Sequence, residues 1–216
     1  MTQSDTAVVV AVQDATRAKS RLGADLDADT RRSLVIAMLD DVLTAIREAH
    51  AGTLIVVSAD VAYDAVARKH HAEVIRDTGE GYNAAIVLTL GRISGRAAAV
   101  LILPGDLPQL RAGDVTAILE ALDVPGVVVV PSTDGGTTAL GLRPLDAIST
   151  AFGPDSAQHH RDAAAAAGVR LTELRLESLR VDVDTLEDLA TVWGAAGRAT
   201  TMLLEHLSLT APGWLA

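Results

Sequence analysis

Cysteine is absent from this chain, and aromatic residues nearly are. The 216 residues include no Cys, and Phe, Trp and Tyr together make up 2% of them. The lack of cysteine excludes a disulfide framework, a thiolate metal site and a cysteine nucleophile. Ala, Val and Leu must therefore build the core. Because 49% of the residues are hydrophobic, the sequence still predicts a folded globular chain rather than a disordered one.

An excess of positive charge and a long apolar run are missing as well. The formal net charge is -10, which argues against nonspecific binding to nucleic acid or to a membrane surface. The first residues, MTQSDTAVVV, lack the basic region of a secretory signal, and no segment reaches the roughly 18 apolar residues of a membrane span. We therefore expect a cytoplasmic protein with no nucleic-acid and no membrane partner. An acidic protein can still bind phosphates through a local basic cluster.

Strand-like and helix-like segments alternate along the chain, which predicts a single α/β domain over residues 1–216. The short apolar segments expected to be strands are 7–12, 54–57, 72–75, 97–103, 126–130, 138–142 and 171–176. The segments expected to be helical are 30–49, 61–70, 82–93, 112–122, 155–167 and 185–206. The last helix, in a C-terminal region of about 185–216, is expected to break near Gly194 and Gly197 because glycine disfavours helix.

The segment 97–110, AAAVLILPGDLPQL, is expected at the centre of the sheet. Its unbroken apolar run, bounded by Pro104 and Gly105, is typical of a strand buried on both faces of a largely parallel sheet. Such sheets bind ligands just beyond the carboxyl ends of their strands, which is where Asp106 follows. The alternative is that Asp106 only hydrogen-bonds its own turn.

The loop after the first strand carries a basic cluster. Arg17, Lys19 and Arg21, with Ser20 among them, suit a polyphosphate, because Arg offers a planar fork and Lys a compact charge. Neither GxxxxGK[ST] nor GxGxxG is present, so this is not a P-loop or a dinucleotide fingerprint. Taken alone, the cluster is more typical of a solvated basic loop than of a phosphate site.

A second candidate lies in the stretch RDTGEGYNAA. Gly79 and Gly81 allow a ligand to approach the backbone closely, and the Asn83 amide can read both donor and acceptor edges of a base. The alternative is a plain helix start capped by Asp77 or Asn83.

Two later loops, GGTTAL (135–140) and FGPDS (152–156), offer bare amides and hydroxyls. Ser156 comes at an expected helix start, where exposed N–H groups attract anions. Here the alternative is a pair of tight turns with Asp155 or Ser156 as helix cap.

In VDVDTLEDL, Asp182 and Asp184 alternate on an extended segment, so both carboxylates face one side. Two such carboxylates suit Mg²⁺, which takes one or two of them plus substrate phosphates. The alternative is that Asp184 or Thr185 caps the last helix.

The order of these motifs resembles one protein family. AKSRL, GYNAA, LPGDLP, GGTTAL, FGPDS and DVDTLEDL follow one another between about residues 8 and 189. In this order they resemble the guanylyltransferases that make the deazaflavin coenzyme of methanogens and actinobacteria. That family includes 2-phospho-L-lactate guanylyltransferase and phosphoenolpyruvate guanylyltransferase. The Ala-rich composition and the Thr in GGTTAL look more like the actinobacterial enzymes, which act on phosphoenolpyruvate.

The resemblance implies a nucleotidyltransferase fold of the nucleotide-diphospho-sugar-transferase type, a three-layer α/β/α sandwich with a mostly parallel mixed sheet. It implies GTP as donor and a small phosphorylated three-carbon acid as acceptor. The family's acceptor contacts correspond to Thr138, Gly153 and Ser156, and its metal-binding carboxylates to Asp106, Asp182 and Asp184, with Mg²⁺ as the cofactor. Many members read GGTNAL, whereas this chain has Thr138 in the Asn place, which leaves the acceptor open.

Within this hypothesis, Arg17, Lys19, Ser20 and Arg21 bind the triphosphate, with Lys19 and Arg21 stabilising the leaving group beside the catalytic Asp106. Gly81 and Asn83 contact the nucleoside. His159 or His160 could assist the acceptor, although a helix-surface position is the simpler expectation. The unstable product requires a downstream transferase, and the apolar stretch 202–216 could cover its own core or a second copy in a homodimer.

Three alternatives stay open at this point. The acceptor could be 2-phospho-L-lactate. The chain could be a related nucleotidyltransferase for a molybdopterin or a sugar phosphate, although the glycine-rich first loop usual in molybdopterin enzymes is missing from residues 12–22. It could also bind a nucleotide without catalysis.

Overall fold

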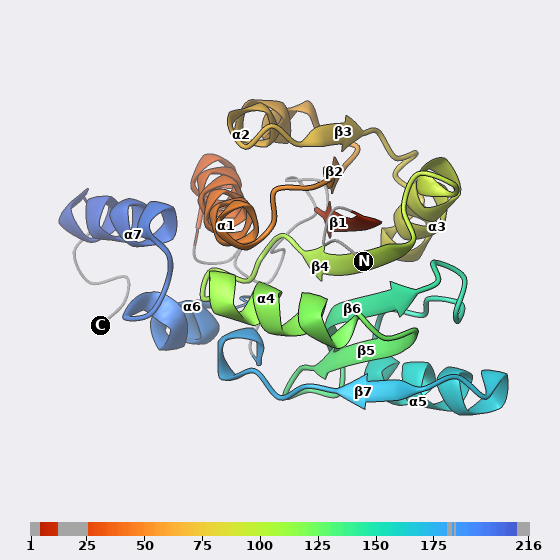
Figure 1. Cartoon of the computed structure of the whole chain (residues 1–216). Coiled ribbons are helices and arrows are strands. Elements are labelled where there is room, and N and C mark those ends of the chain that lie inside the picture. The colour runs from red at the N-terminus through yellow and green to blue at the C-terminus, as the bar shows by residue number, and fades with distance from the viewer. Residues whose placement is uncertain (1–4, 13–25, 181–182, 184, 211–216) are drawn as a thin grey trace.

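The computed structural model describes residues 5–12, 26–180, 183 and 185–210 (Figure 1). Its strands are β1 (Thr6–Ala11), β2 (Leu54–Val57), β3 (Glu73–Ile75), β4 (Ala99–Pro104), β5 (Gly126–Pro131), β6 (Thr137–Arg143) and β7 (Leu171–Glu173). Its α-helices are α1 (Ala28–Ala49), α2 (Asp64–Lys69), α3 (Tyr82–Ile93), α4 (Ala112–Ala121), α5 (Ser156–Ala167), α6 (Leu186–Trp193) and α7 (Arg198–Thr210). Two short 3₁₀ helices are η3 (Val61–Tyr63) and η4 (Glu177–Leu179).

The strands form one sheet in the order β3-β2-β1-β4-β6-β5-β7, with β4 in the middle as expected. The pairs β3–β2, β2–β1, β1–β4 and β5–β7 are parallel. Strand β6 runs antiparallel to both of its neighbours. The prediction of a mostly parallel mixed sheet is therefore confirmed. Because β6 runs against β4, its first residues lie at the edge of the sheet where β4 ends.

Each face of the sheet has its own hydrophobic core. Along β1, Val8 and Val10 belong to the core on one side, whereas Val9 and Ala11 belong to the core on the other. The first core is completed by α1, α2 and α4, and the second by α3 and α5. This alternation follows from the two-residue period of a strand buried on both faces. The three-layer α/β/α sandwich is confirmed.

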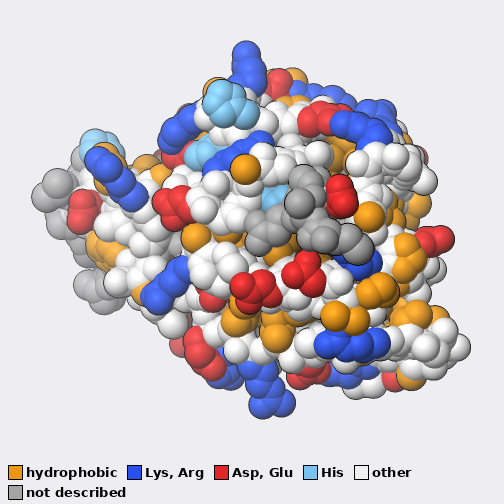
Figure 2. Space-filling model, in the orientation of Figure 1, with side chains coloured by type: hydrophobic (Ala, Val, Ile, Leu, Met, Phe, Trp, Pro, Cys, Tyr) orange, Lys and Arg blue, Asp and Glu red, His pale blue; other side chains and the backbone are white. Residues whose placement is uncertain are grey.

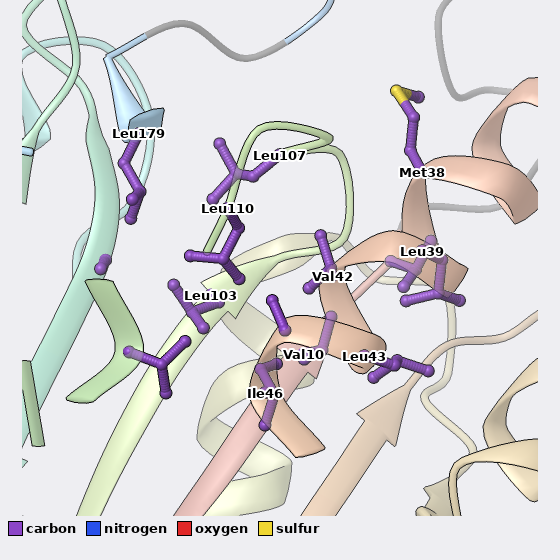
Figure 3. Packing of buried hydrophobic residues seen from close by; sticks show 14 of the residues in the cluster. Val10, Met38, Leu39, Val42, Leu43, Ile46, Leu103, Leu107, Leu110 and Leu179 are labelled. Carbon is purple, nitrogen blue, oxygen red and sulfur yellow. The ribbon is translucent and has the colours of Figure 1, made fainter. Parts of the chain in front are cut away.

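Helix α1 is the main cover of the first face. Its N-terminus is capped by Asp27, whose carboxylate accepts the Thr30 N–H at 2.7 Å. Figure 3 shows Val42 and Ile46 of this helix beside β1 and β4. The same core also contains Met38, Leu39 and Leu43 from α1.

The loop after β4 is pressed against β1 and α1. Gly105 donates its N–H to the carbonyl of Ala11 at 3.2 Å, and a Cβ on Gly105 would lie 2.8 Å from Val12 Cγ2. A side chain at this position would require the Val12 side chain to shift. Glycine therefore lets the loop carrying Asp106 turn immediately beside the end of β1.

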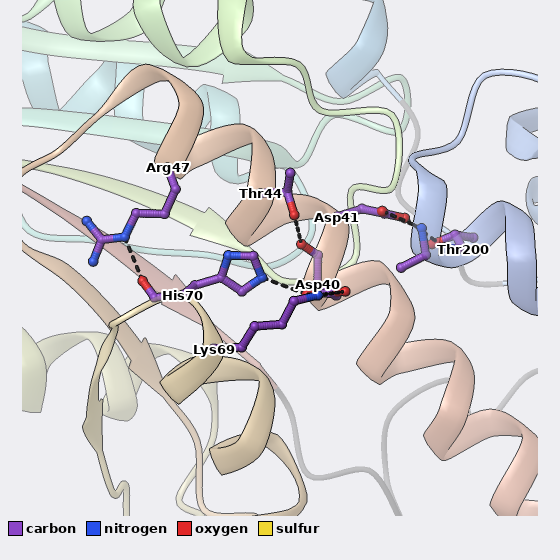
Figure 4. Close-up of polar contacts among 8 residues, drawn as sticks. Asp40, Asp41, Thr44, Arg47, Lys69, His70 and Thr200 are labelled. Atoms are coloured by element: carbon purple, nitrogen blue, oxygen red, sulfur yellow. Dashed lines mark hydrogen bonds and ion pairs between the residues drawn. The ribbon is translucent and has the colours of Figure 1, made fainter.

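The C-terminal helices are anchored by a carboxylate from α1. The expected helix over 185–206 is broken between Trp193 and Arg198, as its glycines suggested. Asp41, which is 8% exposed, accepts the N–H groups of Ala199 at 2.8 Å and Thr200 at 2.9 Å (Figure 4). A Cβ on Gly197 would overlap this carboxylate. Asp41 thus caps α7 from a different helix.

Neighbouring polar contacts tie α1 to α2. Asp40 accepts hydrogen bonds from Lys69 and pairs with His70 Nε2 at 2.6 Å (Figure 4). Burial opposes ionisation of Asp40, but the bonds from Lys69 and His70 outweigh it and lower the pKa of this carboxyl. Arg47 donates to three backbone carbonyls in the turns after α1 and α2.

Charges of both signs lie on the face of the molecule that Figure 2 shows. Figure 2 shows acidic and basic side chains interspersed over the described part of this face, without one continuous basic patch. Within the described ranges, no helix combines the length and apolar character required to cross a membrane.

Replacing Asp41 with Ala should lower the free energy of unfolding by about 1–3 kcal/mol, because the buried N–H of Thr200 and the partly buried N–H of Ala199 lose their acceptor. Urea unfolding measures this change. Glu48→Ala, at an exposed position of the same helix, is the matched control and should change stability by less than about 0.5 kcal/mol. Equal effects of the two substitutions would show that the carboxylate does not anchor α7.

Candidate functional site

A pocket of about 490 Å³ opens at the carboxyl ends of β1 and β2. This is where an open α/β sheet is expected to bind its ligand. The residues that line the pocket come from these strand ends and from the start of α3. They are Ala11, Val12, Val57, Ala59, Asp77, Gly79, Glu80, Gly81, Tyr82 and Ala85.

The rim of the pocket is shaped by the segment leading into α3. Gly79 and Gly81 have φ values of +74° and +107°, which favour glycine. Asp77 accepts the N–H of Gly79 at 2.5 Å and so closes this turn. The helix begins after Gly81 with no side-chain cap, so the alternative that Asp77 or Asn83 caps it is wrong. Its first turn stays uncapped beside the pocket.

Asp106 and Tyr82 lie near each other at this edge. Asp106 is partly exposed on the loop after β4. Burial, and secondarily the negative charge of Asp106, raise the pKa of Tyr82 well above its usual range. The Tyr82 hydroxyl is buried and has no hydrogen-bond partner among the described residues. The hydroxyl therefore stays protonated at neutral pH.

A second polar group forms where β6 and α5 begin. Ser156 Oγ lies 2.9 Å from Thr137 Oγ1, which in turn lies 3.1 Å from Nδ1 of His160. We call Thr137, Ser156 and His160 the hydroxyl cluster. Ser156 and His160 are 1% and 0% exposed. The Ala157 N–H holds the start of α5 against the turn between β5 and β6 by donating to the carbonyl of Gly135 at 3.2 Å.

The expected acceptor residues occupy different positions around this cluster. Ser156 belongs to it, and Gly153 lies in the loop before α5 with a φ of +133°. Thr138 is not part of the hydroxyl cluster, because its buried hydroxyl donates to the Val130 carbonyl at 3.2 Å. The hydroxyl that faces Ser156 is that of Thr137. A contact of Thr138 with the acceptor stays a prediction. Asp155 precedes α5 but its side chain makes no capping hydrogen bond, so the alternative that Asp155 caps this helix is not supported.

The loop before α5 is clamped to α3. Asn83 Nδ2 donates to the carbonyl of Phe152 at 2.8 Å, and the N–H of Phe152 donates to Asn83 Oδ1, also at 2.8 Å. The Phe152 ring makes edge contacts with Tyr82 and with His160, at centroid distances of 4.9 and 5.4 Å. The amide expected to read a base is thus engaged by backbone, and its contact with a nucleoside stays a prediction.

This clamp joins the pocket to the hydroxyl cluster. Tyr82 lines the pocket, Phe152 packs on Tyr82, and His160 packs on Phe152. Sequence reasoning missed Tyr82, Thr137 and Phe152. Only the motifs GYN, GGTT and FGP that contain them signalled this region.

His160 is a core residue, so the expectation of a helix-surface histidine is wrong for it. Burial, and secondarily the neighbouring His159, lower the pKa of His160 from 6.5 to about 4. His160 is therefore neutral near pH 7. His159, one position earlier on α5, is exposed and meets the surface expectation.

Several predicted site residues lie outside the described part of the chain. They are Arg17, Lys19, Ser20, Arg21, Asp182 and Asp184. Within the described ranges, no group of three His, Asp or Glu side chains could hold a metal ion. Thr185 caps α6 in a capping box with Asp188, so the capping role suggested for Thr185 is confirmed.

Stability should fall as the pH falls from 6.5 to 4. Between these pH values His160 binds a proton in the unfolded chain but stays neutral in the native state. By pH 4 this difference lowers the free energy of unfolding by about 3 kcal/mol. Urea unfolding of wild type and His160→Asn between pH 7 and 4 isolates the contribution of His160, because the two proteins have all other titratable groups in common. The stability advantage of wild type should shrink by about that amount on acidification. A constant difference would contradict a depressed pKa.

The comparisons with known proteins agree on one family. Residues 6–211 match the family described as "Guanylyl transferase CofC like". The chain is 39% identical over 206 residues to the phosphoenolpyruvate guanylyltransferase of Roseiflexus sp. (strain RS-1), covering 92% of this chain and 91% of that one. It is 37% identical over 207 residues to the 3-phospho-D-glycerate guanylyltransferase of Phenylobacterium zucineum, covering 92% and 95%.

The fold is also found among solved structures. A putative nucleotide-diphospho-sugar transferase from Desulfovibrio desulfuricans superposes with a TM-score of 0.75 at 18% identity, covering 95% of this chain and 96% of that one. This likeness confirms the nucleotidyltransferase type of fold, and the sequence matches supply the family. The chain belongs to the CofC-like guanylyl transferase family.

Proposed function

We propose that this protein transfers GMP from GTP to phosphoenolpyruvate and releases pyrophosphate. The observation that carries the proposal is the continuous contact from the pocket to the hydroxyl cluster through Tyr82, Phe152 and His160. A nucleotidyl transfer needs two adjacent subsites whose ligands meet at one phosphorus atom. Family membership and relatives named as phosphoenolpyruvate guanylyltransferases support the choice of donor and acceptor.

The pocket at the ends of β1 and β2 is assigned to GTP. Gly81 and the uncapped first turn of α3 offer backbone N–H groups to phosphate or ribose oxygens. Asn83 holds the neighbouring loop through both atoms of its amide, and its contact with the nucleoside stays a prediction. Arg17, Lys19, Ser20 and Arg21 are assigned to the β- and γ-phosphates, where their charge offsets that of the leaving pyrophosphate.

The donor set at this edge fits Mg²⁺. Hard carboxylate oxygens suit this ion, and one or two of them suffice when substrate phosphates complete the shell. Asp106, which is partly exposed and near Tyr82, is the ligand we propose among the described residues, and Asp182 and Asp184, outside the described residues, are proposed as the other two. When bound, Mg²⁺ would neutralise negative charge on the reacting phosphates.

The chemistry asks little of the protein beyond position and charge. An oxygen of the acceptor phosphate attacks the α-phosphorus of GTP, the bond from that phosphorus to the bridging oxygen breaks, and pyrophosphate leaves. The attacking oxygen is already anionic, so no general base is required. The main obstacle is repulsion between two anions, which oriented donors and cations reduce.

The hydroxyl cluster with Gly153 is assigned to the acceptor. Hydroxyls and bare amides bind carboxylate and phosphate oxygens without adding bulk. Phosphoenolpyruvate, 2-phospho-L-lactate and 3-phospho-D-glycerate all carry both groups on three carbons. Relatives of similar identity named for phosphoenolpyruvate and for 3-phospho-D-glycerate make the acceptor a matter for direct assay.

We expect pyrophosphate release in an assay that crosses GTP and ATP with the three acceptors. The downstream transferase is included to trap the unstable product. GTP with phosphoenolpyruvate should be the fastest pair. A faster rate with 2-phospho-L-lactate or 3-phospho-D-glycerate would replace the acceptor and keep the reaction class. GTP binding without pyrophosphate release from any pair would favour a non-catalytic nucleotide-binding protein.

Replacing Asp106 with Asn should reduce turnover by about 100- to 1,000-fold, because a charge that holds the reacting phosphates is lost. The measurement is steady-state pyrophosphate release at saturating Mg²⁺. Asp123→Asn, at an exposed carboxylate just beyond α4, is the matched control and should keep the wild-type rate. A near-wild-type rate for Asp106→Asn would remove Asp106 from the mechanism.

A further inference from the structure

The hydroxyl cluster contains a histidine whose tautomer can be worked out from its neighbours. The N–H of Ala151 lies 3.1 Å from Nε2 of His160. A backbone N–H only donates, so Nε2 must accept with its lone pair. A neutral imidazole carries one proton, which must then sit on Nδ1. Nδ1 therefore donates to Thr137 Oγ1, 3.1 Å away.

This tautomer decides how many hydrogens the cluster can offer to a ligand. Nδ1 of His160 and the hydroxyls of Thr137 and Ser156 carry one hydrogen each. The His160–Thr137 and Thr137–Ser156 contacts use two of these three hydrogens, whichever way the hydroxyls rotate. One O–H is left over. With the proton on Nε2 instead, only two hydrogens would serve two contacts, and the cluster would present only lone pairs.

We propose that His160 is a positioning residue that makes the Thr137–Ser156 pair a hydrogen-bond donor to an anionic oxygen of the acceptor. The inference rests on the proposed function and goes beyond it by assigning a role to a side chain that does not itself reach the acceptor. An anion is bound by donors and repelled by lone pairs, so the direction of this chain decides whether the subsite is attractive.

The device depends on the loop before α5. Ala151, which sets the tautomer, is followed by Phe152, whose backbone is clamped by Asn83 and whose ring packs on His160. The same clamp reaches Tyr82 in the pocket. The acceptor subsite therefore acquires its donor only when this loop is seated on α3.

A purely structural histidine is the competing explanation. Such a residue would affect folding and both substrates alike. A positioning role predicts a loss confined to the acceptor, together with rescue by a side chain that keeps a donor at the place of Nδ1. Asn has such a donor, whereas Leu has none.

The tautomer is tested first, in the wild-type protein. Long-range ¹H–¹⁵N correlation of the histidine rings at pH 7 should show a ring with Nδ1 protonated and Nε2 bare, and this signal should vanish in His160→Asn. A ring protonated on Nε2, or on both nitrogens, would overturn the proposal whether or not the protein is an active transferase.

The functional test compares His160→Leu, His160→Asn and the exposed control His159→Asn. We expect kcat/KM for phosphoenolpyruvate to fall about 10- to 100-fold in His160→Leu, to recover most of that loss in His160→Asn, and to stay at the wild-type value in His159→Asn. Affinity for GTP without acceptor should not change in any variant. Thermal unfolding shows which variants are folded at the assay temperature.

The outcomes separate the two proposals. If wild-type protein releases no pyrophosphate with any acceptor, the proposed function fails, and the affinity of wild type and variants for phosphoenolpyruvate then decides the role of His160. Equal acceptor affinity or kcat/KM in wild type and folded His160→Leu overturns the positioning role. A parallel loss of GTP affinity would do the same and assign His160 to the fold alone.

Discussion

The parallel pairing of β1 with β4 is the constraint on which the rest of the structure depends. Six residue pairs in register, from Thr6 opposite Ala99 to Ala11 opposite Pro104, bring both strand ends to the same edge. The chain reaches β4 only after it has built β2 and β3 on the other side of β1. This reversal of strand order brings Asp106, which follows β4, beside the end of β1, and the residues at that end also line the pocket. The close approach of Gly105 to Val12 keeps that edge compact.

The antiparallel strand β6 adds the second half of the site. Because it runs against β4, its first residue, Thr137, lies at the edge where β4 ends. The hairpin from β5 and the start of α5 meet there, held by the bond between Ala157 and Gly135. The contacts of Asn83 and Phe152 then connect this half to α3. The two subsites thus share one scaffold, although their residues lie 69 positions apart in the chain.

The elements were largely predictable because the core is made of unbroken Val, Ile and Leu runs bounded by Gly and Pro. Strand β2 (Leu54–Val57) and helix α3 (Tyr82–Ile93) have the expected bounds. The burial of His160 was not predictable, since α5 has a polar run, 158–162, followed by five alanines, and neither marks an apolar face. Nor could GGTT reveal which threonine faces Ser156, because adjacent strand residues point to opposite sides. The Asn83 clamp is a long-range contact that no local pattern announces.

The cap on α7 restricts its first turn in an unusual way. Proline is normally favoured at the start of a helix, where a missing N–H costs nothing. Here the N–H groups of Ala199 and Thr200 are both occupied by Asp41 from α1. Proline, which has no N–H, is therefore excluded from these two positions. The hydrogen bonds that the backbone must donate to Asp41 limit sequence variation here more than any side chain does.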